Sequence, residues 1–164
     1  MIGVTEWGVF RLGKLFSKVY KAEAHVKADL IECSPSAANA IAFITRTEID
    51  NGCDCFVENR DVSGIEEGNA IIIGDTTSTF FYQGEPFVTG DHIVVCRANW
   101  INCRTALFVK AVLEKDRYRY SYGRAFKMDL INSTLIRLPQ TPEGKPDWDE
   151  MERRIRALPY GDRI

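Results

Sequence analysis

The sequence predicts an α+β fold, with a β-rich body, a few short helices and a further helix near the C-terminus. In the first two thirds of the chain, short stretches of β-branched and aromatic residues alternate with clusters of Gly, Asn, Asp and Pro, as strands alternate with turns. Beyond residue 100, apolar residues recur every three or four positions, which is typical of helices. The chain has 164 residues, 45% hydrophobic and 27% charged, enough for one domain whose core needs neither disulfides nor a metal.

The β-rich part begins with an extended segment and a turn at residues 7–16, where glycines interrupt the apolar pattern. Asn51-Gly52 is a typical tight-turn pair. The run Ile71-Ile72-Ile73, followed by Gly74-Asp75, indicates a buried strand that ends in a turn. The expected strands are residues 40–45, 53–57, 70–73, 79–82 and 92–96.

The first expected helix lies within residues 101–115. Leu107, Phe108, Ala111 and Val112 have spacings of three and four, so they share one helical face. Asn residues precede this stretch and charged residues follow it, which are common helix boundary signals.

A second helix is expected to begin at Asp147. Pro146 precedes it and Glu150 follows three residues later, which is the pattern of a capping box with an acidic cap. Met151 and Ile155 then fall on one face of the helix. We therefore expect a short amphipathic helix that ends a few residues before the end of the chain.

The five cysteines form an odd set: Cys33, Cys53, Cys55, Cys96 and Cys103. Because no secretory signal is recognisable, we expect free thiols and a cytoplasmic location. The Cys-Asp-Cys spacing is too short for a structural zinc site, and no cofactor motif is found. The sequence contains no run of 18 apolar residues, the length that a membrane-spanning helix needs.

Catalytic signatures are missing from the sequence. It holds no phosphate-binding GxxxxGK[ST] loop, no GxSxG elbow and no HExxH motif. It also lacks the Asn-Pro-Pro-aromatic tetrapeptide of amino-methyltransferases. A cysteine acting with His92, or paired carboxylates such as Asp50 and Asp54, would still be consistent with a small hydrolase.

The net charge of −2 conceals an uneven distribution. Residues 1–90 carry 7 Lys and Arg against 13 Asp and Glu, a net charge of −6, whereas residues 91–164 carry 14 against 10, a net charge of +4. Between Arg97 and Arg137 the balance is 9 against 3, or +6. If the protein binds nucleic acid, this distribution predicts that the attraction is confined to one face, while the acidic part turns away from the duplex or toward a partner.

The basic stretch contains the alternating segment Arg-Tyr-Arg-Tyr-Ser-Tyr-Gly-Arg at residues 117–124. If this segment is a strand, its arginines lie on one face and its tyrosines on the other. Such a face suits nucleic acid, because guanidinium groups bind phosphate or guanine. A half-exposed strand with its tyrosines in the core explains the pattern equally well.

Taken together, several segments resemble the target recognition domain of type I restriction-modification specificity (S) subunits, and of the related subunits in two-subunit type II systems. The matching segments are Trp7-Gly-Val-Phe-Arg-Leu-Gly-Lys-Leu-Phe16, Ala40-Ile-Ala-Phe-Ile-Thr-Arg46 with Asn51-Gly52, Gly68-Asn-Ala-Ile-Ile-Ile-Gly74, Asp91-His-Ile-Val-Val95, Leu130-Ile-Asn-Ser-Thr-Leu-Ile-Arg-Leu-Pro139, and Gly144-Lys-Pro-Asp-Trp148 with Met151-Glu152. Their order and spacing, rather than any single motif, carry the resemblance.

The resemblance implies a domain that reads double-stranded DNA and has no catalytic activity or cofactor of its own. It would dock on a DNA methyltransferase (modification) subunit, which would use S-adenosylmethionine, and through the complex on a restriction subunit. Residues 1–146 would form the recognition domain, and residues 147–164 a C-terminal helix and tail similar to the start of a spacer helix. Because such subunits usually carry two recognition domains, a complete reader would require a homodimer or a longer parent chain.

Candidate DNA contacts follow from this hypothesis, although family members read different sequences. The candidate residues are Arg46, Thr47, Asn51, Ser78, Thr79, Tyr82, Gln83, Arg117, Arg119, Tyr120, Tyr122, Arg124 and Lys127. Gln83 could pair with adenine. Trp148, Met151 and Ile155 are candidates for packing against a partner helix or the domain itself. A β-rich protein-interaction module with a Tyr/Arg face is the alternative function.

Overall fold

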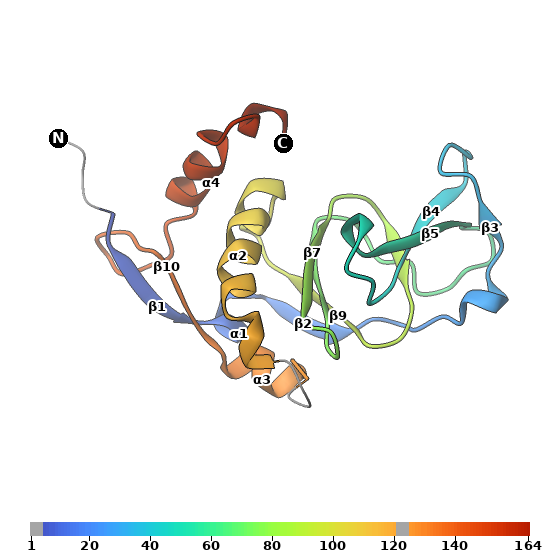
Figure 1. Cartoon of the computed structure of the whole chain (residues 1–164), viewed down its shortest axis with the longest axis horizontal. Helices are drawn as coiled ribbons and strands as arrows, with labels where there is room; N and C mark the ends of the chain where they lie inside the picture. Colours follow the sequence, from blue (N-terminus) through green and yellow to red (C-terminus); the bar gives the residue numbers. More distant parts are fainter. Residues whose placement is uncertain (1–4, 121–124) are drawn as a thin grey trace.

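The computed structural model describes residues 5–120 and 125–164 of the chain. Within these residues the strands form three sheets, and two longer helices and several short helical turns accompany them. Figure 1 shows helix α2 standing between a two-stranded ribbon, with helix α4 beside it, and the two larger sheets. The α+β, β-rich fold class is confirmed.

The two-stranded sheet joins segments from both ends of the chain. Strands β1 (Trp7–Arg11) and β10 (Leu135–Pro139) pair antiparallel, with Val9 opposite Arg137. Sequence reasoning expected only the extended segment of β1. A single helical turn, α1 (Leu12–Leu15), follows β1 and lies against α3 (Met128–Ser133).

The central sheet has the strand order β2-β9-β6-β7, and its neighbours are antiparallel. Every residue of β6 is buried, because Ile71 and Ile73 face one core cluster and Ile72 faces another. Burial on both faces explains why this strand is a continuous apolar run without polar alternation. Its strands are β2 (Lys18–Lys21), β6 (Ala70–Gly74), β7 (Thr79–Gln83) and β9 (Ile93–Arg97).

The third sheet packs on the far face of the central sheet and has the order β3-β5-β4-β8. Strands β4 and β8 run parallel, and the other pairs are antiparallel. Its strands are β3 (Glu32–Cys33), β4 (Ala40–Ile44), β5 (Cys53–Glu58) and β8 (Phe87–Thr89). The five strands expected from the sequence are thus confirmed as β4, β5, β6, β7 and β9.

Both expected longer helices are present, as α2 (Cys103–Lys115) and α4 (Trp148–Arg156). A capping box begins α2: the side chain of Asn102 accepts hydrogen bonds from the backbone N–H of Arg104 and Thr105, and the Thr105 hydroxyl accepts one from the backbone N–H of Asn102. This arrangement satisfies amide groups that the first helical turn would otherwise leave unpaired.

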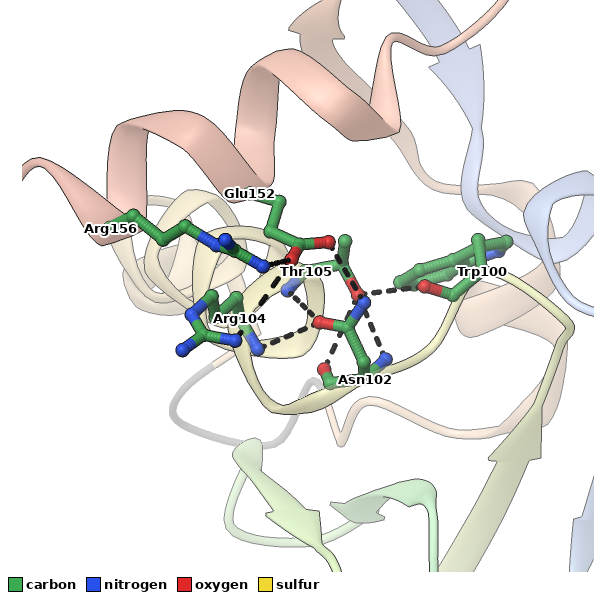
Figure 2. Close-up of polar contacts among 6 residues, drawn as sticks. All are labelled: Trp100, Asn102, Arg104, Thr105, Glu152 and Arg156. Carbon is green, nitrogen blue, oxygen red and sulfur yellow. Dashed lines mark hydrogen bonds and ion pairs between the residues drawn. The ribbon is translucent and has the colours of Figure 1, made fainter. Parts of the chain in front are cut away.

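The same cap ties α2 to α4, as Figure 2 shows. The Asn102 amide donates to Glu152 at 3.2 Å, and Arg156 donates to the same carboxylate at 2.6 Å. These hydrogen bonds, led by the one from Arg156, lower the pKa of Glu152. Glu152 therefore accepts hydrogen bonds from both helices at their crossing.

Helix α4 belongs to the core of this domain. Its acidic cap is confirmed, because Asp147 Oδ1 accepts from the backbone N–H of Glu150 at 2.9 Å. The second half of the expected capping box is not formed, because the backbone N–H of Asp147 donates to the carbonyl of Pro139. Met151 and Ile155 are buried, and the ring of Trp148 stacks on that of Trp100 at 4.0 Å. Of the two alternatives for Trp148, Met151 and Ile155, a partner helix or the domain itself, this structure shows packing within the domain. Met151, which follows residue 146, lies in the same core cluster as Ile71 of β6 and Val94 of β9.

The segment after α2 also differs from the expectation. Residues Arg117–Tyr120 form a 3₁₀ turn, η3, in which the Arg119 N–H donates to the Asp116 carbonyl at 3.0 Å. The strand-like separation of arginines from tyrosines therefore does not apply to residues 117–120. The chain instead turns tightly at the end of α2, while Tyr122 and Arg124 lie outside the described residues.

Three further 3₁₀ turns are η1 (Lys27–Asp29), η2 (Asp50–Gly52) and η4 (Gly161–Arg163). None of the helices in the described ranges combines the length and hydrophobicity that a membrane-spanning segment requires.

Candidate nucleic-acid interface

Three segments that are far apart in the sequence meet beside the turn that connects β6 and β7. They are residues 45–52 between β4 and β5, residues 75–78 in the turn itself, and residues 117–120 of η3. We call this surface the loop cluster. The exposed Arg46 donates from Nη1 to the Thr76 hydroxyl at 3.0 Å, which joins the first segment to the second.

Arg117 joins the third segment to the other two. Its Nη2 donates to Glu48 Oε1 at 2.5 Å and to the carbonyl of Thr77 at 2.8 Å, and its Nη1 lies 3.4 Å from Glu48 Oε2. The hydrogen bond from Arg117 lowers the pKa of Glu48. The guanidinium is therefore held in a fixed orientation by a carboxylate that is ionised at neutral pH.

A second group of polar residues borders the same turn. Asp75 is buried, with His92 Nδ1 at 3.1 Å from its Oδ1 and Lys21 Nζ at 3.8 Å from its Oδ2. His92 Nε2 also lies 3.1 Å from Asp91. Ser78 closes the turn with φ of 53°. The turn is therefore anchored by a buried carboxylate and bordered by basic side chains from β2 and from the residue before β9.

Asn51 connects the loop cluster to the edge of the central sheet. It has φ of 56°, and its amide Nδ2 donates to the carbonyl of Tyr82 at 2.8 Å. In return, Gln83 Nε2 donates to the carbonyl of Asn51 at 2.8 Å. This pair of hydrogen bonds positions residues 45–52 against β7.

Three candidate DNA contacts lie in the interior. Ser78, Thr79 and Gln83 are buried, and the Gln83 amide nitrogen is already bonded to Asn51. In this conformation the three side chains face the interior, so a contact with a base edge would require them to become exposed. They support the turn that carries the exposed residues.

The remaining candidates divide by location. Arg46, Thr47, Asn51 and Arg117 lie in the loop cluster, while Tyr82 is half-buried and donates from its hydroxyl to Asn69 at 2.9 Å.

The other candidates lie in or beyond η3. Arg119 is exposed, 3.7 Å from Asp116, and Lys127 is exposed just before α3. Tyr120 is described only as part of the η3 backbone.

Some basic residues of the stretch between Arg97 and Arg137 make contacts within the domain that stabilise its fold. Arg97 donates to the Tyr20 hydroxyl at 3.1 Å, to Glu66 at 3.0 Å and to two backbone carbonyls. Lys110 pairs with Glu114 and lies over the ring of Phe81. The charge of +6 counted along the sequence therefore overstates the positive charge available to a ligand.

Sequence reasoning missed Glu48, Thr76 and Thr77, which complete the loop cluster. The polar residues after the buried β6 run signalled a turn. No local sequence signal indicated that Arg46 and Arg117 would contact this turn, because they lie 30 and 40 positions from Thr76 and Thr77 in the chain.

The chemistry of the described residues favours binding over nucleophilic catalysis. Burial raises the pKa of the Cys53 and Cys55 thiols, and Cys96 is fully buried with its pKa raised further. A raised pKa leaves little reactive thiolate at neutral pH. No cluster of three His, Cys, Asp or Glu side chains suited to a metal occurs among residues 5–120 and 125–164.

A β scaffold presents arginine and threonine side chains from converging loops, an arrangement that is typical of binding domains. Residues 5–158 match the family described as the type I restriction modification DNA specificity domain, and the chain belongs to this family.

The chain is similar to the type II restriction enzyme BgcI specificity subunit S.BcgI of Heyndrickxia coagulans. The two are 25% identical over 156 residues, which cover 93% of this chain and 43% of that subunit. The chain thus spans less than half the length of this curated relative.

Two solved structures share the fold. The HsdS subunit from Thermoanaerobacter tengcongensis has a TM-score of 0.63 at 13% identity, covering 96% of this chain and 37% of that chain. The S subunit of a type I restriction-modification system from M. genitalium has a TM-score of 0.61 at 12% identity, covering 90% and 36%.

Proposed function

We propose that this chain reads a short sequence in double-stranded DNA and acts as one half of the specificity component of a restriction-modification complex. The convergence of Arg46, Arg117 and the Thr76-Thr77 turn on one exposed surface supports this proposal most directly. Guanidinium groups bind phosphate oxygens in a bidentate geometry, so two arginines held by neighbouring loops suit a phosphate backbone better than scattered surface lysines do.

In the proposed complex, phosphate contacts from the arginines position the domain, and side chains on the loops reach base edges in a groove. The proposed DNA contacts are Arg46, Thr47, Asn51, Tyr82, Arg117, Arg119, Tyr120, Tyr122, Arg124 and Lys127, now joined by Thr76 and Thr77. Because the loop cluster is anchored to the central sheet by Asn51 and Gln83, these residues would meet DNA already oriented.

The proposal assigns catalysis to partner subunits. A DNA methyltransferase (modification) subunit would transfer the methyl group, and a restriction subunit would cleave. The complex would act in the cytoplasm, and a two-part target would be read by two copies of this domain or by a longer parent chain.

The test is binding of a fluorescent duplex from a randomised pool, measured by anisotropy at low salt with the protein alone and with its cognate modification subunit. We expect enrichment of one short sequence and affinity that falls with added salt. The variant Arg46→Ala/Arg117→Ala should lose at least tenfold in affinity. The control is Arg60→Ala, because this exposed arginine lies beyond the opposite end of β5 from the loop cluster.

Failure of the wild-type protein to bind any duplex, alone and with the subunit, would reject the proposal. An unchanged affinity in the double variant would reject the assignment of the loop cluster. The hydrolase alternative predicts turnover of ester or phosphodiester substrates that thiol alkylation abolishes.

A further inference from the structure

A groove of about 650 Å³ runs between the β1–β10 ribbon and the C-terminal half of α2. Its apolar lining includes Val9 and Leu135, whose exposed fractions are 62% and 56%, and Trp7. In Figure 1 the ribbon lies alongside α2, away from the third sheet. Adjacent exposed aliphatic side chains on a small domain mark an interaction surface, because each one costs free energy while it faces water.

The rim of this groove is basic. Lys115, Arg119 and Arg137 line it, against the single carboxylate of Asp116, which lies 3.7 Å from Arg119. Within the described part of the chain, Lys115 and Arg137 form no ion pair or side-chain hydrogen bond. Arg137 stands directly opposite Val9 in the strand pair, so an unpaired cation and an exposed aliphatic side chain share one face.

We propose that this groove binds an amphipathic helix that carries acidic side chains beside its apolar stripe, supplied by the modification subunit of the proposed complex. The groove volume is comparable to one helical turn with its side chains, on the order of 500 Å³. The apolar floor favours a protein ligand over a phosphate backbone, which would gain nothing from Val9 or Leu135. This inference rests on the proposed function for the identity of the partner.

The position of the groove would place the partner beside the bound DNA. Arg119 lines the groove, whereas Arg117, two residues earlier in η3, belongs to the loop cluster. The 3₁₀ turn therefore borders both surfaces, with Arg117 in the loop cluster and Arg119, itself a proposed DNA contact, at the rim of the groove. A helix seated in the groove would contact the element that also holds the proposed DNA contact.

The test compares complex formation between the full chain and its cognate modification subunit, measured by titration calorimetry. We expect Val9→Asp and Leu135→Asp to weaken binding at least tenfold, because each removes an apolar contact and places a carboxylate that repels the acidic side chains of the partner helix. Matched controls are Val26→Asp and Leu158→Asp, whose wild-type side chains are 65% and 54% exposed outside the groove. Both controls should bind within about twofold of the wild type.

Arg137→Glu provides a second variant that leaves the strand's apolar residues intact. It should weaken the complex with the subunit while leaving duplex binding by the isolated chain nearly unchanged. If Val9→Asp, Leu135→Asp and Arg137→Glu all bind the subunit with wild-type affinity, the groove inference is overturned and the proposed function is unaffected.

If these variants lose duplex binding but still bind the subunit normally, the groove is a DNA surface and the inference is also overturned. If the wild-type chain binds DNA but not the subunit, both this inference and the partner part of the proposed function fail.

Discussion

At the scale of single residues, the ion pair between Glu48 and Arg117 places a carboxylate where a DNA phosphate would bind. The guanidinium already donates to both Glu48 oxygens, the arrangement that phosphate oxygens would take in the proposed complex. Because Arg117 lowers the pKa of Glu48, the competing charge is present at pH 7. Glu48 thus orients Arg117, and in the proposed complex it would also oppose indiscriminate attachment to DNA.

We therefore expect Glu48→Gln to tighten binding to random-sequence duplex about fivefold at low salt. Removing one negative charge next to a phosphate is worth about 1 kcal/mol in a water-like environment. Anisotropy titrations with random and selected duplexes would measure this change, with Glu32→Gln, an exposed carboxylate on β3, as the control. Weaker binding to both duplexes would show that Glu48 only orients the arginine.

Gly52 is the residue whose backbone most limits substitution in the loop cluster. Its φ is 79°, and an added Cβ would lie 3.0 Å from the Phe81 ring. We expect Gly52→Ala to destabilise the protein by about 1–3 kcal/mol, since the strained conformation and the contact add. Gly84→Ala is the matched control, because its φ is not left-handed and its nearest contact is 3.4 Å. Chemical denaturation would measure both, and equal effects would contradict the argument.

At the scale of elements, the α2–α4 contact depends on the cap at Asn102. Asn102→Ala removes the acceptor for the N–H groups of Arg104 and Thr105 and the donor to Glu152. We expect a loss of about 1–2 kcal/mol in the free energy of unfolding. Asn99→Ala, an exposed asparagine outside the helix, should change stability little. Urea unfolding would measure the difference, and equal midpoints would show that the cap contributes nothing.

The same contact predicts an acid dependence. Because Arg156 and Asn102 lower the pKa of Glu152 in the folded state, the folded protein holds this proton less tightly than the unfolded chain. The stabilisation is therefore present above the ordinary glutamate pKa of about 4.3 and is lost as the pH falls through the folded-state value. Glu152→Gln should show a smaller drop in melting temperature between pH 7 and pH 3 than the wild type, whereas an equal drop would contradict this assignment.

The sequence predicted elements whose signal is local. Strand β6 is a continuous β-branched run, and α4 has an acidic cap followed by an amphipathic face, so both were predicted near their observed positions. Strand β8 is three residues long and β10 gains its pairing from β1, over 120 positions away, so neither has a local signature. The condition set for the Arg-Tyr alternation, that the segment is a strand, is not met at residues 117–120, because these residues form a 3₁₀ turn at the end of α2. For the site, the sequence supplied Arg46 and Arg117, but their convergence on Thr76 and Thr77 depends on tertiary contacts.

At the scale of the whole molecule, the acidic and basic halves are less separate than their sequence counts suggest. Glu66 of the acidic half binds Arg97 of the basic half, and Glu48 binds Arg117. These pairs neutralise part of the charge that long-range attraction to DNA would use. Because the Glu48–Arg117 pair reduces the positive charge of the loop cluster, an isolated domain should bind duplex weakly, and affinity would come from engaging two half-sites at once.

This reasoning predicts the behaviour of two copies of the chain fused through a flexible Gly/Ser linker. On a duplex with two selected sites, the second copy binds at a high effective concentration, so the apparent affinity should rise by about 10²–10⁴-fold over one copy. On a duplex with one site the gain should stay near twofold, the statistical factor. Anisotropy titrations over a series of site separations would measure both, with an optimum where the linker spans the sites. Equal gains on one-site and two-site duplexes would mean that the second copy contributes only non-specific charge, which would contradict recognition by paired half-specificity domains.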